Sequence, residues 1–310
     1  MYNQELKDKF LSTITSNSSL GGIKSLFNRS EEYENKFNTD LYNMSKEQLL
    51  ETLESISGVR MASQRNVIGY VRRYADWLSN SMGIETSRAA WEINKLGDSR
   101  LKETMISSPE SLQSLLDVFL DKTEFATKHC VYRCAWWLMF IGIMPEDINN
   151  VQKKDIDLNN KIIYFNNRQY KIYDEAIGAF KMCINSKSFY VTHPKYKMPT
   201  LIDRVGDGLL DSVRSVVTAR VAYREIKKVV SNSKSTVQFK LTLDSTWISG
   251  EFYRMKIAED SGFNVDFSGL VDCTYKKVDS TDAIREAQVR KELANRYMRD
   301  YLSWKEVFFS

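Results

Sequence analysis

Basic side chains recur at helical spacing in two stretches of this 310-residue sequence. The stretch from 63 to 80 carries Arg65, Arg72 and Arg73, and the stretch from 209 to 230 carries Arg220, Arg224, Lys227 and Lys228. Such side chains contact the phosphates of a nucleic-acid backbone, whatever its base sequence. An ordinary solvated helix face is the alternative for both stretches. Phosphate contact is favoured for the second, where only Glu225 balances charge of one sign over two turns.

The cysteines and histidines of the sequence do not form a pattern that indicates a metal site or a reactive thiol. The four cysteines lie at positions 130, 134, 183 and 273 without a paired CxxC spacing. Cys130 and Cys134 share one apolar helix face and are expected to be reduced core residues. The two histidines are His129, within an apolar helical pattern, and His193, in a basic segment. The sequence therefore predicts no metal site and no cofactor.

The composition describes a globular protein with room for two domains. Hydrophobic residues make up 43% and charged residues 27% of the chain, and no apolar run reaches the length of about eighteen residues that spans a membrane. The first residues, MYNQELKDKF, are polar and contain no signal-peptide centre. We therefore expect a cytoplasmic protein without a membrane partner. The net charge of +4 is compatible with a nucleic-acid partner.

Apolar periodicity predicts the helices that carry the basic residues. One stripe predicts a helix from 63 to 80 with its arginines on the other side, and is formed by Val67, Tyr70, Val71, Tyr74 and Leu78. Ser45 and Gln48 form a capping box, which predicts a helix from about 46 to 58. A further helix is predicted from 209 to 230. Residues 16–22 indicate a turn or flexible joint, residues 190–199 a basic loop, and residues 236–244 an extended segment.

A different pattern occupies residues 127–172. Apolar residues on most sides predict a buried core helix that includes Trp136 and Trp137, and Gly142 and Pro145 end it. From Asp155 the apolar period changes to two, and turn residues at 157–160 and 166–167 predict a small antiparallel hairpin sheet. The expected fold class is mainly α with a small antiparallel β-sheet (α+β).

This order of buried helix, glycine turn, short helix, Asp-Ile-Asp-Leu segment and hairpin resembles the start of the catalytic domain of tyrosine recombinases (phage integrases). The helix with Tyr70, Tyr74 and Trp77 is similar to the DNA-facing helix of that family's core-binding domains. The resemblance implies a two-domain architecture, and Ser108-Pro109 marks a helix start at which the domains would join. We predict a helical, SAM-like core-binding domain at 1–107 and a catalytic-like domain at 108–310.

Two phosphate-binding positions that the resemblance implies are altered. Met144 stands where the family has an arginine that contacts the scissile phosphate. Counting back from Gly262 places Ile248 at the histidine and Glu251 at the arginine of the family's second signature, and shifting the register to use Arg254 leaves Glu251 at the histidine. A neutral thioether and a carboxylate cannot stabilise a phosphoryl transition state as arginines do. The catalytic site is therefore predicted to be degenerate.

Other family roles are implied for residues on the hairpin and in the last helix. Arg168 or Lys171 could stand for the family's hairpin lysine, and Tyr297 or Tyr301 lies roughly where its nucleophilic tyrosine is expected. The residues that we expect to contact DNA are Arg65, Arg72, Arg73, Arg168, Lys171, Arg220, Arg224, Lys227, Lys228 and Arg254.

The sequence is most similar to the recombinase-fold master repressors (YopR-like) of SPβ-like Bacillus phages, in length and in its GIMPED, DIDL and ISGEFYR segments. This resemblance implies a sequence-specific DNA-binding transcriptional regulator, a prophage repressor that maintains lysogeny and is not an enzyme. The alternatives are an active tyrosine recombinase that cleaves DNA through a C-terminal tyrosine, and a helical protein-interaction module.

The resemblance also implies partners and a location. The partners would be operator sites in double-stranded DNA, a phage-encoded regulator, and a second copy of the chain bound through the apolar C-terminal tail. The location would be the nucleoid of a bacterial host.

Overall fold

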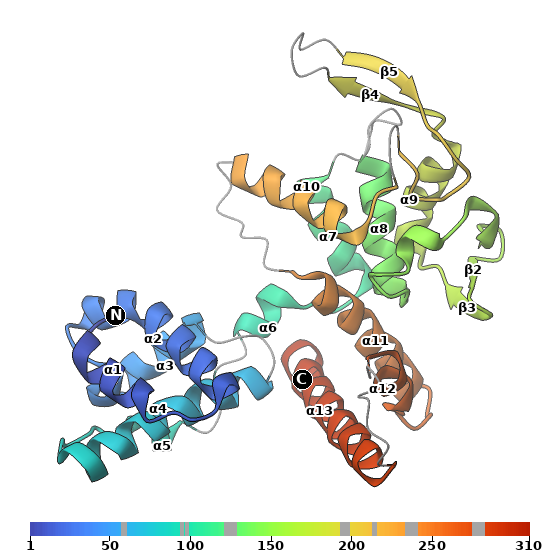
Figure 1. Ribbon diagram of the computed structural model, residues 1–310. Coiled ribbons are helices and arrows are strands. Elements are labelled where there is room, and N and C mark those ends of the chain that lie inside the picture. Colours follow the sequence, from blue (N-terminus) through green and yellow to red (C-terminus); the bar gives the residue numbers. More distant parts are fainter. Residues whose placement is uncertain are drawn as a thin grey trace. The chain divides into compact units, whose positions relative to one another are not determined.

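The described part of the chain is mainly helical with small antiparallel sheets, which confirms the predicted fold class, and it contains a second sheet beyond the predicted one (Figure 1). The computed structural model describes residues 1–56, 61–93, 96, 99–120, 129–192, 199–212, 216–232, 241–274 and 283–310. The fold divides into two compact units. Unit 1 comprises residues 1–101 and 278–303, and unit 2 comprises residues 102–277 and 304–310. The predicted joint at 107/108 stays a prediction.

Unit 1 is a bundle of helices. Its elements are α1 (Gln4–Ser12), α2 (Asn17–Phe37), η1 (Leu41–Asn43), α3 (Lys46–Ile56), α4 (Met61–Met82), α5 (Ala89–Glu92) and most of α13 (Ala283–Phe309). The helix predicted from 63 to 80 is confirmed as α4. The capping box is also confirmed, because Gln48 N donates to Ser45 Oγ over 3.3 Å and Ser45 N donates to Gln48 Oε1 over 3.0 Å.

The aromatic residues of α4 belong to the core of unit 1. Tyr74 is fully buried, and its ring lies 5.1 Å from Phe10 and 5.0 Å from Phe27. The ring of Trp77 lies 5.4 Å from that of Phe10. The burial of Tyr74 confirms its predicted place in the apolar stripe, and its side chain stabilises the packing of α4 on α1 and α2.

The turn predicted at residues 16–22 is wrong. These residues begin α2, where Ser16 caps the helix by accepting from Ser19 N at 3.5 Å. Gly22 permits a close approach of α2 and α4, since a Cβ there would lie 2.6 Å from the Tyr70 hydroxyl. The glycine that suggested a flexible joint is thus a packing residue.

Unit 2 contains the remaining helices and both sheets. The helices are α6 (Ser99–Thr104), which begins in unit 1, α7 (Pro109–Phe119), α8 (His129–Ile141), α9 (Asp174–Asn185), α10 (Ala219–Asn232), α11 (Leu243–Asp260) and α12 (Ser268–Thr274). Two short 3-10 helices are η2 (Ile148–Asn150) and η3 (Lys153–Asp155). The predicted helix start at Ser108-Pro109 is confirmed, because Ser108 accepts from Ser111 N at 3.3 Å.

Helix α8 forms the centre of the unit 2 core, and α9, α10 and α11 all pack against it (Figure 1). Every residue from Cys130 to Ile141 is buried, which confirms the predicted core helix and the core role of Trp136 and Trp137. The Cys134 thiol donates to Ala179 O over 3.2 Å, and Cys130 and Cys134 are both free cysteines.

The predicted hairpin sheet is confirmed. It consists of β1 (Ile156–Asp157), β2 (Ile162–Phe165) and β3 (Arg168–Lys171) in antiparallel order. Asn166 and Asn167 adopt φ of 49° and 59°, the left-handed pair that a tight two-residue hairpin requires. Asp157 holds the preceding turn by accepting from the backbone of Asn159 and Asn160, each at 3.0 Å.

The two ends of the basic loop predicted at 190–199 belong to a second hairpin. Here β4 (Ser188–Thr192) pairs with β5 (Pro199–Asp203), so that Tyr190 lies opposite Leu201. The prediction of a loop is wrong for residues 190–192, because Tyr-Val-Thr favours an extended strand once a partner is present. His193 lies outside the described residues.

The helix predicted from 209 to 230 begins only at Ala219. Leu209 and Leu210 are buried in an irregular segment, where Leu209 N donates to Val151 O over 2.8 Å and Val217 N to Leu210 O over 2.8 Å. These long-range bonds replace a helical turn. Of the predicted extended segment, residues 236–240 lie outside the described part, and Leu243 and Asp244 belong to α11.

Among the described helices, none combines the length and apolarity that crossing a membrane requires.

Candidate nucleic-acid interface

One face of α4 is basic and faces away from the unit 1 core. Arg65 and Arg73 are both exposed, and Gly69 lies exposed between them at one-turn spacing. A Cβ added to Gly69 would meet nothing within 4 Å. The buried side of the same helix is formed by Ile68, Val71, Tyr74, Ala75 and Leu78. Arg65 and Arg73 can therefore reach a ligand without any change in the packing of unit 1.

Arg72 does not belong to this exposed face. Its guanidinium is half-buried and donates through Nε to Ala90 O over 2.9 Å and through Nη2 to Ile93 O over 3.0 Å. These bonds attach α4 to α5 and the segment after it. The expectation of an exposed Arg72 is wrong, because the adjacent arginines 72 and 73 project at different angles around the helix.

The second basic face lies on α10 and is more complete. Its members share spacings of i, i+4, i+7 and i+8, all are exposed, and they are Arg220, Arg224, Lys227 and Lys228. The opposite side of the helix buries Ala219, Ala222 and Ile226, and packs on α7 and α8 (Figure 1). We call these four residues the α10 stripe. Unlike Arg72, which is half-buried, all four are exposed on the side opposite to the buried residues.

Two contacts order part of the α10 stripe. Lys228 Nζ lies 2.6 Å from Glu225 Oε1, and Lys227 Nζ lies 5.5 Å from the centre of the Tyr223 ring. Glu225 compensates one of the four positive charges, so the stripe keeps a net charge of about +3 on one helix face. This is the property that binding to a phosphate backbone needs.

The hairpin residues Arg168 and Lys171 are exposed on β3. Arg168 Nη1 lies 3.9 Å from the thiol of Cys273 on α12, and this thiol raises the pKa of the Arg168 guanidinium. The structure therefore places α12 beside the end of β3. Both cations remain available at the edge of unit 2.

The positions that the resemblance to recombinases assigns to a catalytic signature lie on α11 and at the turn after α8, and α11 crosses the end of α8 closely. Gly250 permits this crossing, because a Cβ there would overlap the carbonyl oxygen of Phe140. Trp247 Nε1 donates to Gly142 O over 3.1 Å, and Gly142 has a φ of +118°. Ile248 is buried, and Met144 is half-buried at the turn that follows Gly142. Neither Ile248 nor Met144 carries a charge toward solvent.

Arg254 caps the carboxyl end of α8. Its Nη1 donates to Phe140 O over 2.9 Å and also to Ile141 O, and its Nη2 forms an ion pair with Glu251 Oε1 at 2.6 Å. The last carbonyls of a helix have no partner within the helix and carry partial negative charge, so a guanidinium stabilises them. The side chain of Arg254 is 30% exposed and that of Glu251 is 22% exposed.

The Arg254 guanidinium also lies near a half-buried tyrosine, Tyr173. Burial raises the pKa of the Tyr173 phenol, and the positive charge of Arg254 partly opposes that rise. The ring of Tyr173 also packs 5.7 Å from that of Tyr253 on α11. Arg254 thus has carbonyl, carboxylate and phenol neighbours within unit 2, and its contact with DNA stays a prediction. Periodicity could not reveal this role, because the carbonyls that it caps lie more than a hundred residues earlier.

The two candidate nucleophiles are buried. Tyr297 is 3% exposed and Tyr301 is 2% exposed, and the guanidinium of Arg296 lies 5.4 Å from the centre of the Tyr297 ring. A nucleophilic tyrosine must bring its oxygen to a phosphorus atom. Neither side chain lies at the surface in this conformation.

The apolar tail packs within unit 2. Trp304 is fully buried, donates through Nε1 to Ile106 O over 3.0 Å, and lies 5.9 Å from the ring of Phe252. The ring of Phe309 lies 5.1 Å from that of Trp304. Self-association through the tail stays a prediction, and it is not needed to explain why these aromatic residues are present.

The N-terminal part of the chain matches a known protein family. Residues 1–80 match the family described as MrpR, N-terminal core-binding domain. The chain is also 24% identical over 216 residues to the SPbeta prophage-derived uncharacterized protein YopR of Bacillus subtilis (strain 168), an alignment that covers 64% of this chain. The chain spans 60% of the length of YopR. The resemblance to YopR-like prophage proteins that the sequence predicts is confirmed by these two matches.

Solved structures give weaker likenesses. The structure of XerA recombinase matches with a TM-score of 0.38 and 13% identity, over 93% of this chain and 98% of that chain. The Tn1549 transposon integrase in complex with a circular intermediate DNA matches with a TM-score of 0.34 and 14% identity, over 92% of this chain and 98% of that chain.

Proposed function

We propose that this protein is a DNA-binding regulator of a prophage that binds double-stranded DNA without cleaving it. The observation that carries the proposal is the α10 stripe, four exposed cations on one face of a helix whose other face is buried. The exposed pair Arg65 and Arg73 on α4 supports it, because the match to the MrpR core-binding domain covers this helix. Each unit therefore offers a basic helix face of its own.

A regulator is favoured over a strand-exchange enzyme by the charges around the end of α8. Cleavage by a tyrosine needs cations that stabilise the charge on the transition state, and the loss of one such donor costs about 10²–10³ in rate. Met144 and Glu251 supply no cation, and the guanidinium of Arg254 is engaged by carbonyls and by Glu251. A carboxylate beside a phosphate would add repulsion. The residues around the end of α8 thus fit a protein that binds DNA better than one that cleaves it.

The setting of this function follows from the similarity to YopR, which is named as derived from the SPbeta prophage. We propose that the DNA partner consists of operator sites and that the protein acts as a repressor at the nucleoid. Phosphate contacts fix position and orientation, while base edges in the grooves supply sequence specificity. The α10 stripe and the α4 face are assigned to the first of these tasks.

The test is the salt dependence of binding to a labelled duplex from the source genome. Each phosphate contact that is lost should reduce the slope of log affinity against log salt by about 0.9. Arg220→Ala with Arg224→Ala should therefore flatten the slope by nearly two units. The matched control is Lys181→Ala with Lys187→Ala, which removes the same charge from exposed positions of unit 2.

The control pair should leave the slope unchanged apart from a weak long-range effect of net charge. Equal slopes for the α10 variant, the control and the unmodified chain would show that the α10 stripe is an ordinary solvated face. The proposal would then lose the observation that carries it.

A further inference from the structure

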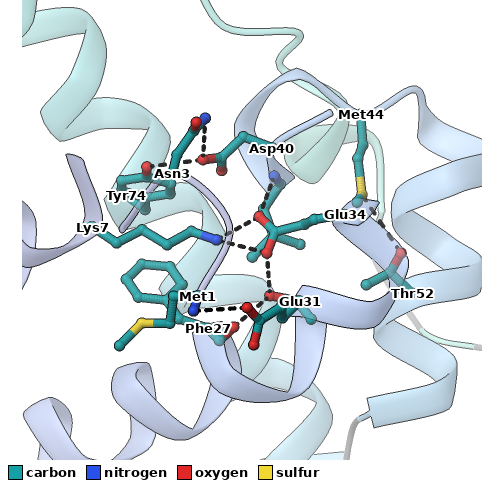
Figure 2. A network of polar contacts seen from close by, with 12 residues as sticks. Met1, Asn3, Lys7, Phe27, Glu31, Glu34, Asp40, Met44, Thr52 and Tyr74 are labelled. Atoms are coloured by element: carbon teal, nitrogen blue, oxygen red, sulfur yellow. Dashed lines mark hydrogen bonds and ion pairs between the residues drawn. The ribbon is translucent and has the colours of Figure 1, made fainter. Parts of the chain in front are cut away.

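Unit 1 buries three ionisable side chains together beneath its surface (Figure 2). Lys7 of α1 and Glu34 of α2 are 0% exposed, and Asp40, just before η1, is 3% exposed. Charged groups are costly to bury unless they are paired and hydrogen-bonded. One ammonium and two carboxylates leave a net charge of −1 in a site that is closed to water.

Glu34 is fully engaged. Lys7 Nζ donates to both of its carboxylate oxygens over 2.6 Å, Ser30 Oγ donates to Oε2 over 3.0 Å, and Leu41 N donates to Oε1 over 3.0 Å. These donors stabilise the ionised form of Glu34. The Lys7 ammonium is therefore matched by the Glu34 carboxylate, as Figure 2 shows.

Asp40 is left with weaker partners. Its Oδ2 accepts from Asn3 Nδ2 at 3.1 Å and from the Tyr74 hydroxyl at 3.4 Å (Figure 2). Its Oδ1 is covered and accepts no hydrogen bond from the part of the chain that the structure describes. A second carboxylate beside Glu34 with one oxygen bare of donors is an arrangement that favours the neutral acid.

We propose that Asp40 holds a proton at neutral pH, so that the docking of α1 on α2 and α4 is coupled to proton binding. The proton removes the excess negative charge from the buried cluster. It resides on Asp40, because the oxygens of Glu34 are already occupied by donors.

The other groups around the cluster add no further net charge. Burial raises the pKa of both carboxyls, and the rise is opposed by the charge of Lys7 and, for Asp40, by the side chains of Asn3 and Glu34 and the backbone of Tyr42. Burial also raises the pKa of the phenols of Tyr42 and Tyr74, so both stay neutral at physiological pH. The terminal amine of Met1 is 2.9 Å from Glu31, which compensates it. Residues 1–101 contain no histidine that could take up the proton instead.

The sign of the pH effect follows from linkage. Unfolding returns Asp40 to water, where its pKa is near 3.9, so the folded unit binds one more proton than the unfolded chain between that pKa and the raised one. The stability that the proton supplies is thus complete at low pH and is lost as pH rises through the folded pKa. The folded to unfolded ratio should fall by up to about tenfold per pH unit over this interval.

Amide hydrogen exchange of the full chain measures this directly. Protection of residues 4–37, corrected for the intrinsic rate of exchange, should decline from pH 5 to pH 7 by up to about tenfold per unit in the unmodified protein. Asp40→Asn resembles the neutral acid in shape and should remove most of that decline. The matched control is Asp8→Asn on the exposed side of α1, which should retain it.

Two further measurements separate a proton from a merely structural role. The infrared carbonyl band of a protonated carboxyl should be present at pH 7 in the unmodified chain and in Asp8→Asn, and absent from Asp40→Asn. Glu34→Gln places an amide N–H against the Lys7 ammonium and should lower protection at every pH.

The proposal is overturned if Asp40→Asn keeps the pH dependence, if it lowers protection at all pH values, or if the unmodified protein shows no protonated carboxyl at pH 7. Removal of the pH dependence by Glu34→Gln in place of Asp40→Asn would overturn the assignment to Asp40.

Discussion

Substitution of Arg254 distinguishes a structural arginine from a phosphate-binding one. The resemblance to tyrosine recombinases would make Arg254 a phosphate contact, whereas its bonds to Phe140 O and Ile141 O and its ion pair with Glu251 make it the cap of α8. Arg254→Met keeps the apolar stem and removes every one of these contacts. A structural role then changes stability, and a phosphate-binding role changes the salt dependence of DNA binding.

The expected loss of stability can be worked from the contacts. A hydrogen bond to a charged group contributes about 1.5–3 kcal/mol, and the partial exposure of the guanidinium reduces the total for the cap and ion pair to about 2 kcal/mol. For a unit of this size, 1 kcal/mol shifts Tm by about 2–4 °C. Arg254→Met should therefore lower the Tm of unit 2 by about 4–8 °C.

Thermal unfolding and DNA binding are measured on the same preparations, with Arg224→Met as the matched control. The control should leave Tm within about 1 °C, because exposed surface substitutions change stability by less than about 0.5 kcal/mol. It should flatten the salt slope by about 0.9, which Arg254→Met should not do. An unchanged Tm together with a flattened slope for Arg254→Met would refute the capping role and return Arg254 to the DNA interface.

Two other predictions concern the same region of unit 2 and the last helix. Gly250→Ala should destabilise the protein by about 1–3 kcal/mol despite the better helix propensity of alanine, because the new methyl group would overlap Phe140 O. The control in a urea titration is Ser261→Ala, which lies outside the contact with α8. Equal urea midpoints for the two variants would contradict the close approach of α11 and α8. No covalent adduct should form with a nicked suicide duplex, and Tyr297→Phe or Tyr301→Phe should leave affinity within about twofold; a phosphotyrosine-linked fragment from the unmodified chain would show that cleavage occurs.

Helices with a regular apolar stripe could be predicted from the sequence. The pattern of Val67, Val71 and Leu78 defined α4, and the all-round apolar pattern at 130–141 defined α8, because burial of an apolar face is a local property of spacing. The first hairpin followed from the Asn166-Asn167 pair, whose left-handed conformation is intrinsic to the turn.

Elements that depend on distant partners could not be predicted in this way. The segment at 209–217 looks helical by composition, yet Leu209 bonds to Val151 and so leaves the helix. Residues 17–22 look like a joint, yet Gly21 and Gly22 lie within α2 because Tyr70 occupies the space beside Gly22. In both cases a tertiary contact overrides the local preference.

The roles of charged side chains also depend on distant partners and could not be predicted from the sequence. In the sequence, Arg72 of α4 cannot be told apart from the four cations of the α10 stripe, because all of them lie opposite an apolar stripe. In the structure the α10 cations are exposed, whereas Arg72 is half-buried and bonded to backbone carbonyls. Ala90 O and Ile93 O lie beside Arg72, and Phe140 O and Ile141 O lie beside Arg254, so these guanidiniums replace missing backbone donors.

In the proposed function, the scaffold binds DNA without strand-exchange chemistry. A guanidinium at the end of α8 is close to carbonyls that need donors whether or not DNA is present. Once the neighbouring position is Glu251, the ion pair holds Arg254 against those carbonyls, and its attraction for a phosphate is offset by the carboxylate. In the α10 stripe, Lys228 pairs with Glu225 and Lys227 lies over the Tyr223 ring, and all four side chains are exposed. Binding and stability can thus be assigned to different cations of unit 2, which is why the Arg254 and Arg224 variants should separate in the two assays.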